Sequence, residues 1–374
     1  GRILDSEDVS YRGNVCLGES ESIRLADIDE LAFDAVLVAV GAQGIKWIQV
    51  EGSEAEGIYD AKQLVYHYNG LPPFASQDIT LGDDLVVIGA GNVAVDITHW
   101  AVQQNVKRIT WLVRRGPSQV KYTPKEIKYV GGHVDRDALR DEFDRLAPQL
   151  KAIGEDADEV WEAMTGRFGD QRVGDSESSI SMRFAVQAHQ VIVRDDGRFG
   201  GLEVTENDLH LTDERVQCRP SERRFSLEAE SLVFCVGDAV ETEFGLSLDR
   251  WGNYAMAAPA SADEQSYAIE GRTGWFAAGW ARVASDGLVG KARKDAERAC
   301  AALSGYLESR PPKSTPEAVL SALDNLLTER DVVAIDWPQF QSARAAEEAR
   351  AEAEGLEDFR FTTNAELLRE AGLL

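Results

Sequence analysis

Short apolar runs, each ending at a glycine, are the clearest pattern along the chain. A strand that is buried on both faces is apolar at every position, as in a parallel sheet whose two faces are covered. Such runs therefore predict parallel strands that enter tight turns at their carboxyl ends. The three runs cover residues 35–40, 85–88 and 231–236, and they end at Gly41, Gly89 and Gly237.

Helical and alternating patterns fill the space between these runs. Residues 92–104 have the length and apolar spacing of a helix, and residues 108–113 return to a strand pattern. Residues 134–178 are acidic and helix-patterned, whereas 182–236 carry period-two runs that predict antiparallel strands. Residues 291–307 and three shorter patterns in the tail predict further helices. The order predicts an α/β fold with a β-rich excursion.

Composition narrows the class of protein. A chain of 374 residues favours two or three domains. No apolar run approaches the roughly 20 residues of a membrane span, and the charged opening residues contain no secretory signal, which favours the cytoplasm. The net charge of −26 disfavours a nucleic-acid partner, because such a surface repels phosphate backbones.

The four cysteines argue against a metal centre within this chain. Cys16, Cys218, Cys235 and Cys300 are scattered, and no C-x-x-C pair is present. This spacing disfavours a cysteine-ligated iron–sulfur cluster, a zinc ribbon and a disulfide framework. We expect buried, reduced thiols, because free cysteine is most often a core residue.

The segment LVVIGAGNVAVD (85–96) carries the strongest chemical signal. Gly89, Gly91 and Ala94 stand in G-x-G-x-x-A register between an apolar strand and a helix. In a dinucleotide-binding unit the first glycine permits the tight turn, the second lets a pyrophosphate approach the backbone, and a small third residue lets the helix pack on the strand. The free N–H groups of the first helical turn then face the phosphates.

The end of the next strand indicates which dinucleotide is bound. An acidic residue there would bond the 2′-hydroxyl of NAD, but the sequence places Arg114 and Arg115 at that position. Two guanidinium groups can grip a 2′-phosphate in fork geometry. The pattern therefore favours NADPH over NADH, with a solvated basic turn as the alternative.

Several segments resemble the adrenodoxin reductase and ferredoxin–NADP reductase group. They are GNVAVD (91–96), WLVRRGPSQVKYTPKEI (111–127), YRGNVCLG (11–18), GWARVASDGLVGKARKDA (279–296) and the tail from DWPQF (336–340) onward. The resemblance implies two Rossmann-like dinucleotide-binding domains, with an NADP domain inserted in a discontinuous FAD domain. The expected bounds are 1–43 and 241–374 for the FAD domain and 44–240 for the NADP domain.

The resemblance also implies roles for individual residues. The NADP pyrophosphate would meet Gly91, Asn92 and Val93 after the Gly89 turn, and the 2′-phosphate would meet Arg114 and Arg115. Glu126 would lie near the nicotinamide carboxamide and Asp96 in a polar network near the flavin. The residues that would contact FAD are Leu17, Trp280, Gly287 and Leu288. A buried tryptophan is more often a plain core residue, which is the alternative for Trp280.

One part of the family pattern is not found. The family begins with a second glycine fingerprint that binds the FAD pyrophosphate, and the sequence, which starts at Gly1, contains no second strand-linked fingerprint. We expect an unrecorded N-terminal segment, and secondly a partner chain that supplies this half-site. Loss of the half-site is the third alternative.

The resemblance implies an FAD-containing, NADPH-dependent reductase that exchanges single electrons with a ferredoxin-type iron–sulfur protein. The first alternative is an electron-input subunit of a larger redox complex, because the spacing from Gly89 to Arg114 also resembles the small subunit of glutamate synthase. The second is a cofactor-binding scaffold with no activity of its own.

Overall fold

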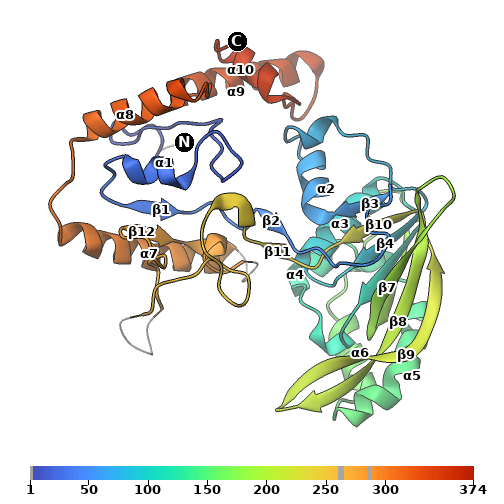
Figure 1. Cartoon of the computed structure of the whole chain (residues 1–374). Helices are drawn as coiled ribbons and strands as arrows, with labels where there is room; N and C mark the ends of the chain where they lie inside the picture. Colours follow the sequence, from blue (N-terminus) through green and yellow to red (C-terminus); the bar gives the residue numbers. More distant parts are fainter. Residues whose placement is uncertain (1–2, 260–264, 285–288) are drawn as a thin grey trace. The chain divides into compact units, whose positions relative to one another are not determined.

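The computed structural model describes residues 3–259, 265–284 and 289–374, and these form two compact units (Figure 1). The first unit, here called the outer unit, contains Gly1–Lys46, Gly70–Ser76 and Asp238–Leu374. The second, here called the inner unit, contains Trp47–Asn69 and Gln77–Gly237. The inner unit is thus inserted in the sequence of the outer one.

A five-stranded parallel sheet forms the centre of the inner unit. Its order is β3–β10–β4–β5–β6, so the last strand in sequence, β10, lies between the first two. The strands are β3 (Ile58–Asp60), β4 (Asp84–Ile88), β5 (Arg108–Val113), β6 (Ser179–Phe184) and β10 (Ser231–Phe234).

Both faces of this sheet are buried, which explains the uninterrupted apolar runs. Leu85 and Val87 of β4 point into a core shared with the helices. Val86 and Ile88 point into a second core, shared with an antiparallel sheet. The helices of the unit are α2 (Ala61–Tyr68), α3 (Asn92–Gln103), α4 (Pro124–Ile127), α5 (Arg136–Ala152) and α6 (Ala157–Thr165), with short 3-10 turns η2 (Pro117–Gln119) and η3 (Gly131–His133).

The antiparallel sheet is the predicted β-rich excursion. It consists of β7 (Val186–Val193), β8 (Phe199–Thr212) and β9 (Arg215–Glu228) in sequence order. Strands β8 and β9 form a long hairpin whose turn residues, Asp213 and Glu214, both have positive φ. The hairpin extends past the end of the parallel sheet (Figure 1).

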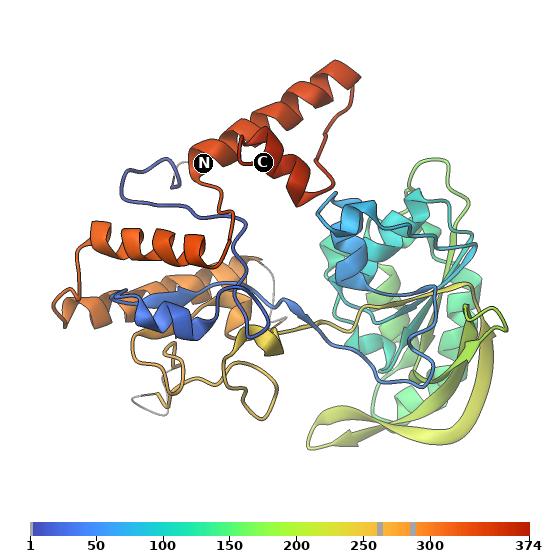
Figure 2. The ribbon, with the colours of Figure 1, turned by 45° about the horizontal axis from the view of Figure 1, so that its top comes forward.

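The outer unit repeats the same construction on a smaller scale. Strands β1 (Val36–Val38) and β12 (Trp275–Ala277) pair in parallel, and β2 (Gly44–Ile45) pairs with β11 (Asp238–Ala239) in antiparallel. Helices α1 and α7 lie on opposite sides of β1 and β12 (Figure 2). The helices are α1 (Leu25–Glu30), α7 (Val289–Glu308), α8 (Pro316–Glu329), α9 (Trp337–Glu354) and α10 (Asn364–Glu370), and the 3-10 turns are η1 (Phe74–Ser76), η4 (Thr242–Phe244) and η5 (Gly279–Ala281).

The predicted α/β fold with parallel strands is confirmed, but two details of burial differ. The expectation of buried thiols is wrong for Cys16 and Cys300, which are exposed, and Cys218 is half-buried. All four are free thiols, and Cys235 at the end of β10 is buried. In α7 the apolar face expected from the sequence contains Ala292, Ala296, Ala299, Leu303 and Tyr306, and of these only Ala299 is fully buried.

Within the described ranges, no helix is long and apolar enough to cross a membrane. The same ranges contain no group of three or more histidine, cysteine or acidic side chains placed to hold a metal ion.

Candidate dinucleotide site

The turn from β4 into α3 depends on glycine at its first position. Gly89 has φ +132°, a conformation that side chains rarely adopt. A Cβ atom here would lie 2.3 Å from the backbone oxygen of Cys235, which directly follows the neighbouring strand β10. No substitution fits without moving backbone, so the sheet itself requires Gly89.

The second glycine is free of any such constraint. A Cβ atom on Gly91 would meet nothing within 4 Å, and its φ of −105° is open to any residue. Gly91 is the N-cap of α3, and no side chain caps this helix. The helix start therefore presents backbone N–H groups and the positive end of its dipole to an open space, as an anionic pyrophosphate requires. Ala94, fully buried, packs α3 on the sheet.

The segment that follows β5 is hydrogen-bonded to the turn between β4 and α3. Asn92 accepts a hydrogen bond from the backbone N–H of Thr123 through its Oδ1, at 2.8 Å. The backbone oxygen of Ala90 accepts from the N–H groups of Lys121 and Tyr122, at 2.8 and 3.2 Å. The Asn92 side chain is thus used within the protein, which leaves its backbone N–H for a ligand.

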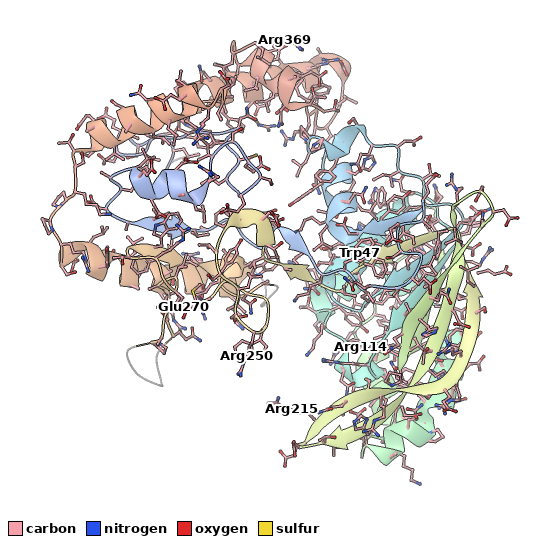
Figure 3. All side chains as sticks on the ribbon, viewed as in Figure 1. Trp47, Arg114, Arg215, Arg250, Glu270 and Arg369 are labelled. Atoms are coloured by element: carbon pink, nitrogen blue, oxygen red, sulfur yellow. The ribbon has the colours of Figure 1, made fainter. Side chains whose placement is uncertain are left out.

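Arg114 and Arg115 follow β5 directly and are both exposed (Figure 3, which labels Arg114). Neither guanidinium group pairs with a carboxylate anywhere in the described chain. Both lie close enough to Cys218 of β9 to affect its thiol: burial raises the pKa of Cys218, and the two positive charges oppose that rise. The site therefore holds two adjacent cations that lack an internal counter-ion in an otherwise acidic protein.

Asp96 and Glu126, the two predicted catalytic residues, lie close together within the inner unit. Although the Asp96 residue is exposed, partial burial of its carboxyl group raises its pKa, and the negative charge of Glu126 raises it further. The nearby His99 lowers it. Glu126 is placed by α4, where the Thr123 side chain caps the helix start by accepting from the Glu126 N–H. The protonated form of Asp96 is thus favoured relative to an isolated aspartate.

In the outer unit, η5 carries Trp280 against α7. Asp295 of α7 accepts a 2.7 Å hydrogen bond from the Gly279 N–H and forms an ion pair with Arg282. The Arg282 guanidinium also lies 4.9 Å from the ring centre of Tyr267. These contacts fix the turn on both sides of Trp280.

Trp280 itself is half-buried and lines a cavity of about 260 Å³. Its indole Nε1 is fully buried and has no hydrogen-bond partner among the described residues. A buried donor without a partner is costly, so this position fits a bound group that offers an acceptor. Leu17 is half-buried and packs on the same unit's core, while Gly287 and Leu288 lie outside the described residues.

Sequence reasoning missed the residues that support the site. Asn207, Thr123 and Asp295 each hold a predicted site segment in place through a hydrogen bond. Only Thr123 had a usable signal, because Thr-Pro followed by an acidic residue is typical of a helix start. Asn207 and Asp295 are distant in sequence from the segments they hold, so no local pattern marks them.

Comparison with known proteins gives relatives along nearly the whole chain, although no protein-family model matches it. Human mitochondrial NADPH:adrenodoxin oxidoreductase is 24% identical, over 97% of this chain and 78% of its own length. The NADPH-ferredoxin reductase FprA of Mycobacterium tuberculosis is also 24% identical, over 97% of this chain and 84% of its own.

A solved structure of Mycobacterium tuberculosis FprA in complex with NADPH has the same fold. It superposes with a TM-score of 0.80 at 23% identity and covers 99% of this chain and 85% of the FprA chain. The predicted resemblance is therefore confirmed in sequence and in fold. The chain is similar in sequence, over nearly its whole length, to NADPH:adrenodoxin oxidoreductases and to the NADPH-ferredoxin reductase FprA, and it has the fold of FprA.

Proposed function

We propose that the protein is an FAD-containing, NADPH-dependent reductase that exchanges single electrons with a ferredoxin-type iron–sulfur protein. The observation that carries the proposal is the pairing of two features in the inner unit. The uncapped start of α3 is open at Gly91, and the next strand is followed by two exposed arginines that form no ion pair with any described carboxylate. Relatives named for NADPH and for adrenodoxin or ferredoxin support the same assignment.

On the NADPH side, different residues would bind different parts of the ligand. The N–H groups of Asn92 and Val93 would hold the pyrophosphate, and Arg114 and Arg115 would hold the 2′-phosphate. Glu126 and Asp96 would lie toward the nicotinamide end. Because the pKa of Asp96 is raised, its carboxyl group would hold a proton more readily than an isolated aspartate does.

On the flavin side, the buried Nε1 of Trp280 would donate to an acceptor on the cofactor. FAD, when bound there, would supply the chemistry that links a two-electron nicotinamide donor to a one-electron iron–sulfur centre. Asp295 and Arg282 would keep Trp280 in position for this contact.

The visible spectrum of the purified full-length chain tests the proposal. We expect flavin absorbance that bleaches on addition of NADPH under argon and returns on addition of an oxidised [2Fe–2S] ferredoxin. A protein that binds no FAD when supplied with it would contradict the flavin assignment. Bleaching by NADPH without transfer to any ferredoxin would contradict the proposed acceptor only.

Replacing Arg114 and Arg115 together by alanine tests the choice of dinucleotide. We expect NADPH to bind about tenfold or more weakly, with NADH binding unchanged, because charge-assisted bonds to a phosphate are lost. Arg223→Ala is the matched control, since Arg223 is an exposed arginine of the same unit that already pairs with Glu206 and Asp208. An unchanged preference for NADPH in the double variant would show that the 2′-phosphate is held elsewhere.

A further inference from the structure

We infer that Asn207 is a positioning residue that holds the Arg114–Arg115 turn in the geometry that selects a 2′-phosphorylated dinucleotide. This inference rests on the proposed function and deepens it. Asn207 lies on β8 of the antiparallel sheet, 93 positions from Arg114, and its side chain donates from Nδ2 to the backbone oxygen of Arg114 at 3.1 Å.

A closed set of three hydrogen bonds surrounds this contact. The Asn207 N–H donates to the oxygen of Ala185 at 2.7 Å, and the Ala185 N–H donates to the oxygen of Arg115 at 2.9 Å. The Asn207 side chain completes the set at Arg114. Three separate segments, the β5 turn, the β6–β7 junction and β8, are thereby tied together at one point.

The backbone around Asn207 is shaped for this purpose. Ala185 has φ +50°, a left-handed conformation that is unfavourable for a residue other than glycine. The pairing of β8 with β9 shifts register between Thr205 and Asn207, which is the irregularity that turns a strand residue out of its usual alternation. Bulges of this kind re-aim side chains next to functional sites.

The chemistry of Asn207 argues against a purely structural role. The residue is fully buried, and its Oδ1 has no hydrogen-bond partner among the described residues. A buried acceptor without a partner destabilises the folded state, and an apolar residue would avoid that cost. Its Nδ2 bond to Arg114 offers the reason for its presence.

The consequence for binding follows from pre-organisation. Both guanidinium groups are exposed and have no ion pair with a described carboxylate, so the backbone of the turn is what limits their motion. If the turn loosens, the bound arrangement must be ordered at the expense of affinity. The loss falls on the 2′-phosphate alone, because the pyrophosphate is held at α3, on a different segment.

Binding of small ligands to the full-length chain tests this inference without requiring flavin turnover. Asn207→Asp keeps the shape and removes the donor, and Asn207→Ala removes both polar groups. By titration calorimetry we expect 2′,5′-ADP and NADPH to bind about three- to tenfold more weakly, because the hydrogen bond that orders the turn is lost. Binding of 5′-AMP and NADH should not change.

Gln149→Ala is the matched control. Gln149 accepts a 2.8 Å hydrogen bond from the N–H of Leu209, two residues along the same strand, and takes part in none of the three hydrogen bonds at the Arg114–Arg115 turn. We expect Gln149→Ala to lower the melting temperature about as much as Asn207→Ala does but to leave the 2′,5′-ADP affinity unchanged. This result would show that Asn207→Ala weakens binding through the position of the turn and not through a general loosening of the unit. Equal losses for Gln149→Ala and Asn207→Ala would overturn the inference.

A double-mutant cycle distinguishes failure of this inference from failure of the proposed function. In the Arg114→Ala/Arg115→Ala background, Asn207→Ala should cause no further loss of NADPH affinity, because the groups it positions are gone. If the two arginines matter and Asn207 does not, only the positioning role is refuted. If the arginines themselves do not matter, the dinucleotide assignment is refuted as well.

Discussion

The two units have a similar architecture, but the described residues form more of the proposed cofactor site in the inner unit than in the outer unit. In each, parallel strands buried on both faces lie beside a segment proposed to meet a cofactor. In the inner unit the turn from β4 into α3 supplies the pyrophosphate part of that site through backbone, so the shape of this part is fixed by the sheet. In the outer unit the described part of the site is held by side chains, chiefly the Asp295–Arg282 pair around Trp280.

This difference indicates where each site is vulnerable. A site made of backbone at a sheet edge is lost when the sheet cannot form, whereas a site clamped by side chains is lost one contact at a time. We therefore expect substitutions in the inner unit and in the outer unit to affect stability and ligand binding in different proportions. Four substitutions test this expectation.

The largest effect is expected for Gly89→Ala. The added Cβ would lie 2.3 Å from the Cys235 oxygen at a φ of +132°, so the unfolding free energy of the inner unit should fall by about 3 kcal/mol or more. Hydrogen exchange followed by peptide should show the loss in the inner unit's strands and not in the outer unit. Gly154→Ala, at φ +83° with open space around it, is the control and should cost about 1 kcal/mol.

Asp295→Ala should come second and should act on the outer unit. It removes the acceptor of the Gly279 N–H and leaves a mostly buried Arg282 without its carboxylate, which costs about 1–3 kcal/mol. The fraction of chain that retains FAD through gel filtration should fall in parallel. Glu297→Ala, which breaks an exposed pair with Arg293 on the same helix, should change stability by less than about 0.5 kcal/mol. Equal behaviour of the two variants would show that the clamp has no role.

Gly91→Ala should affect binding without affecting folding. No atom of the described residues lies within 4 Å of the added Cβ, so the melting temperature should be unchanged, while NADPH should bind about tenfold more weakly because the methyl group occupies the approach of the pyrophosphate. Calorimetric titration checks the affinity. Normal NADPH binding in this variant would place the pyrophosphate away from α3.

The smallest effect is expected for Asp96→Asn, and it depends on pH. The pKa of Asp96 is raised in the folded protein, so the folded state favours its protonated form and pays for ionisation as the pH rises through that raised pKa. Asparagine mimics the protonated acid. The variant should be more stable than the parent by a few tenths of a kcal/mol at pH 7, after solvent screening, and the gain should vanish near pH 4. Urea unfolding at both pH values measures it, and a gain that grows toward acid pH would contradict the assignment.

Much of the inner unit could be predicted from sequence, because a strand that is buried on both faces appears as an uninterrupted apolar run in the local sequence. Strand β4, helix α3 and strand β5 were each expected within one residue of the observed bounds, and the Gly89 turn followed from the same run. The position of Arg114 and Arg115 directly after β5 was likewise readable from the local sequence, because they follow the last apolar residue of the strand.

The supporting contacts could not be predicted, because they join segments far apart in sequence. Asn207 reaches Arg114 only after β6, β7 and β8 have paired, and nothing in the run EVTEND (203–208) marks one polar residue as buried. The prediction of buried thiols was wrong at Cys16 and Cys300 for a related reason. Residue type gives an average burial, whereas the local fold decides each case.

Burial on both faces also has a consequence for how the chain tolerates insertions and deletions. Because β4 is apolar at 85, 86, 87 and 88, shifting it by one residue would exchange its two faces and still bury apolar side chains on each. Hydrophobicity therefore does not set the alignment of this strand against β10. Gly89 does, since any other residue moved opposite the Cys235 oxygen would clash with it. We expect length changes in β4 to be excluded by this one glycine, and length changes at the Asp213–Glu214 tip of the β8–β9 hairpin to be accepted.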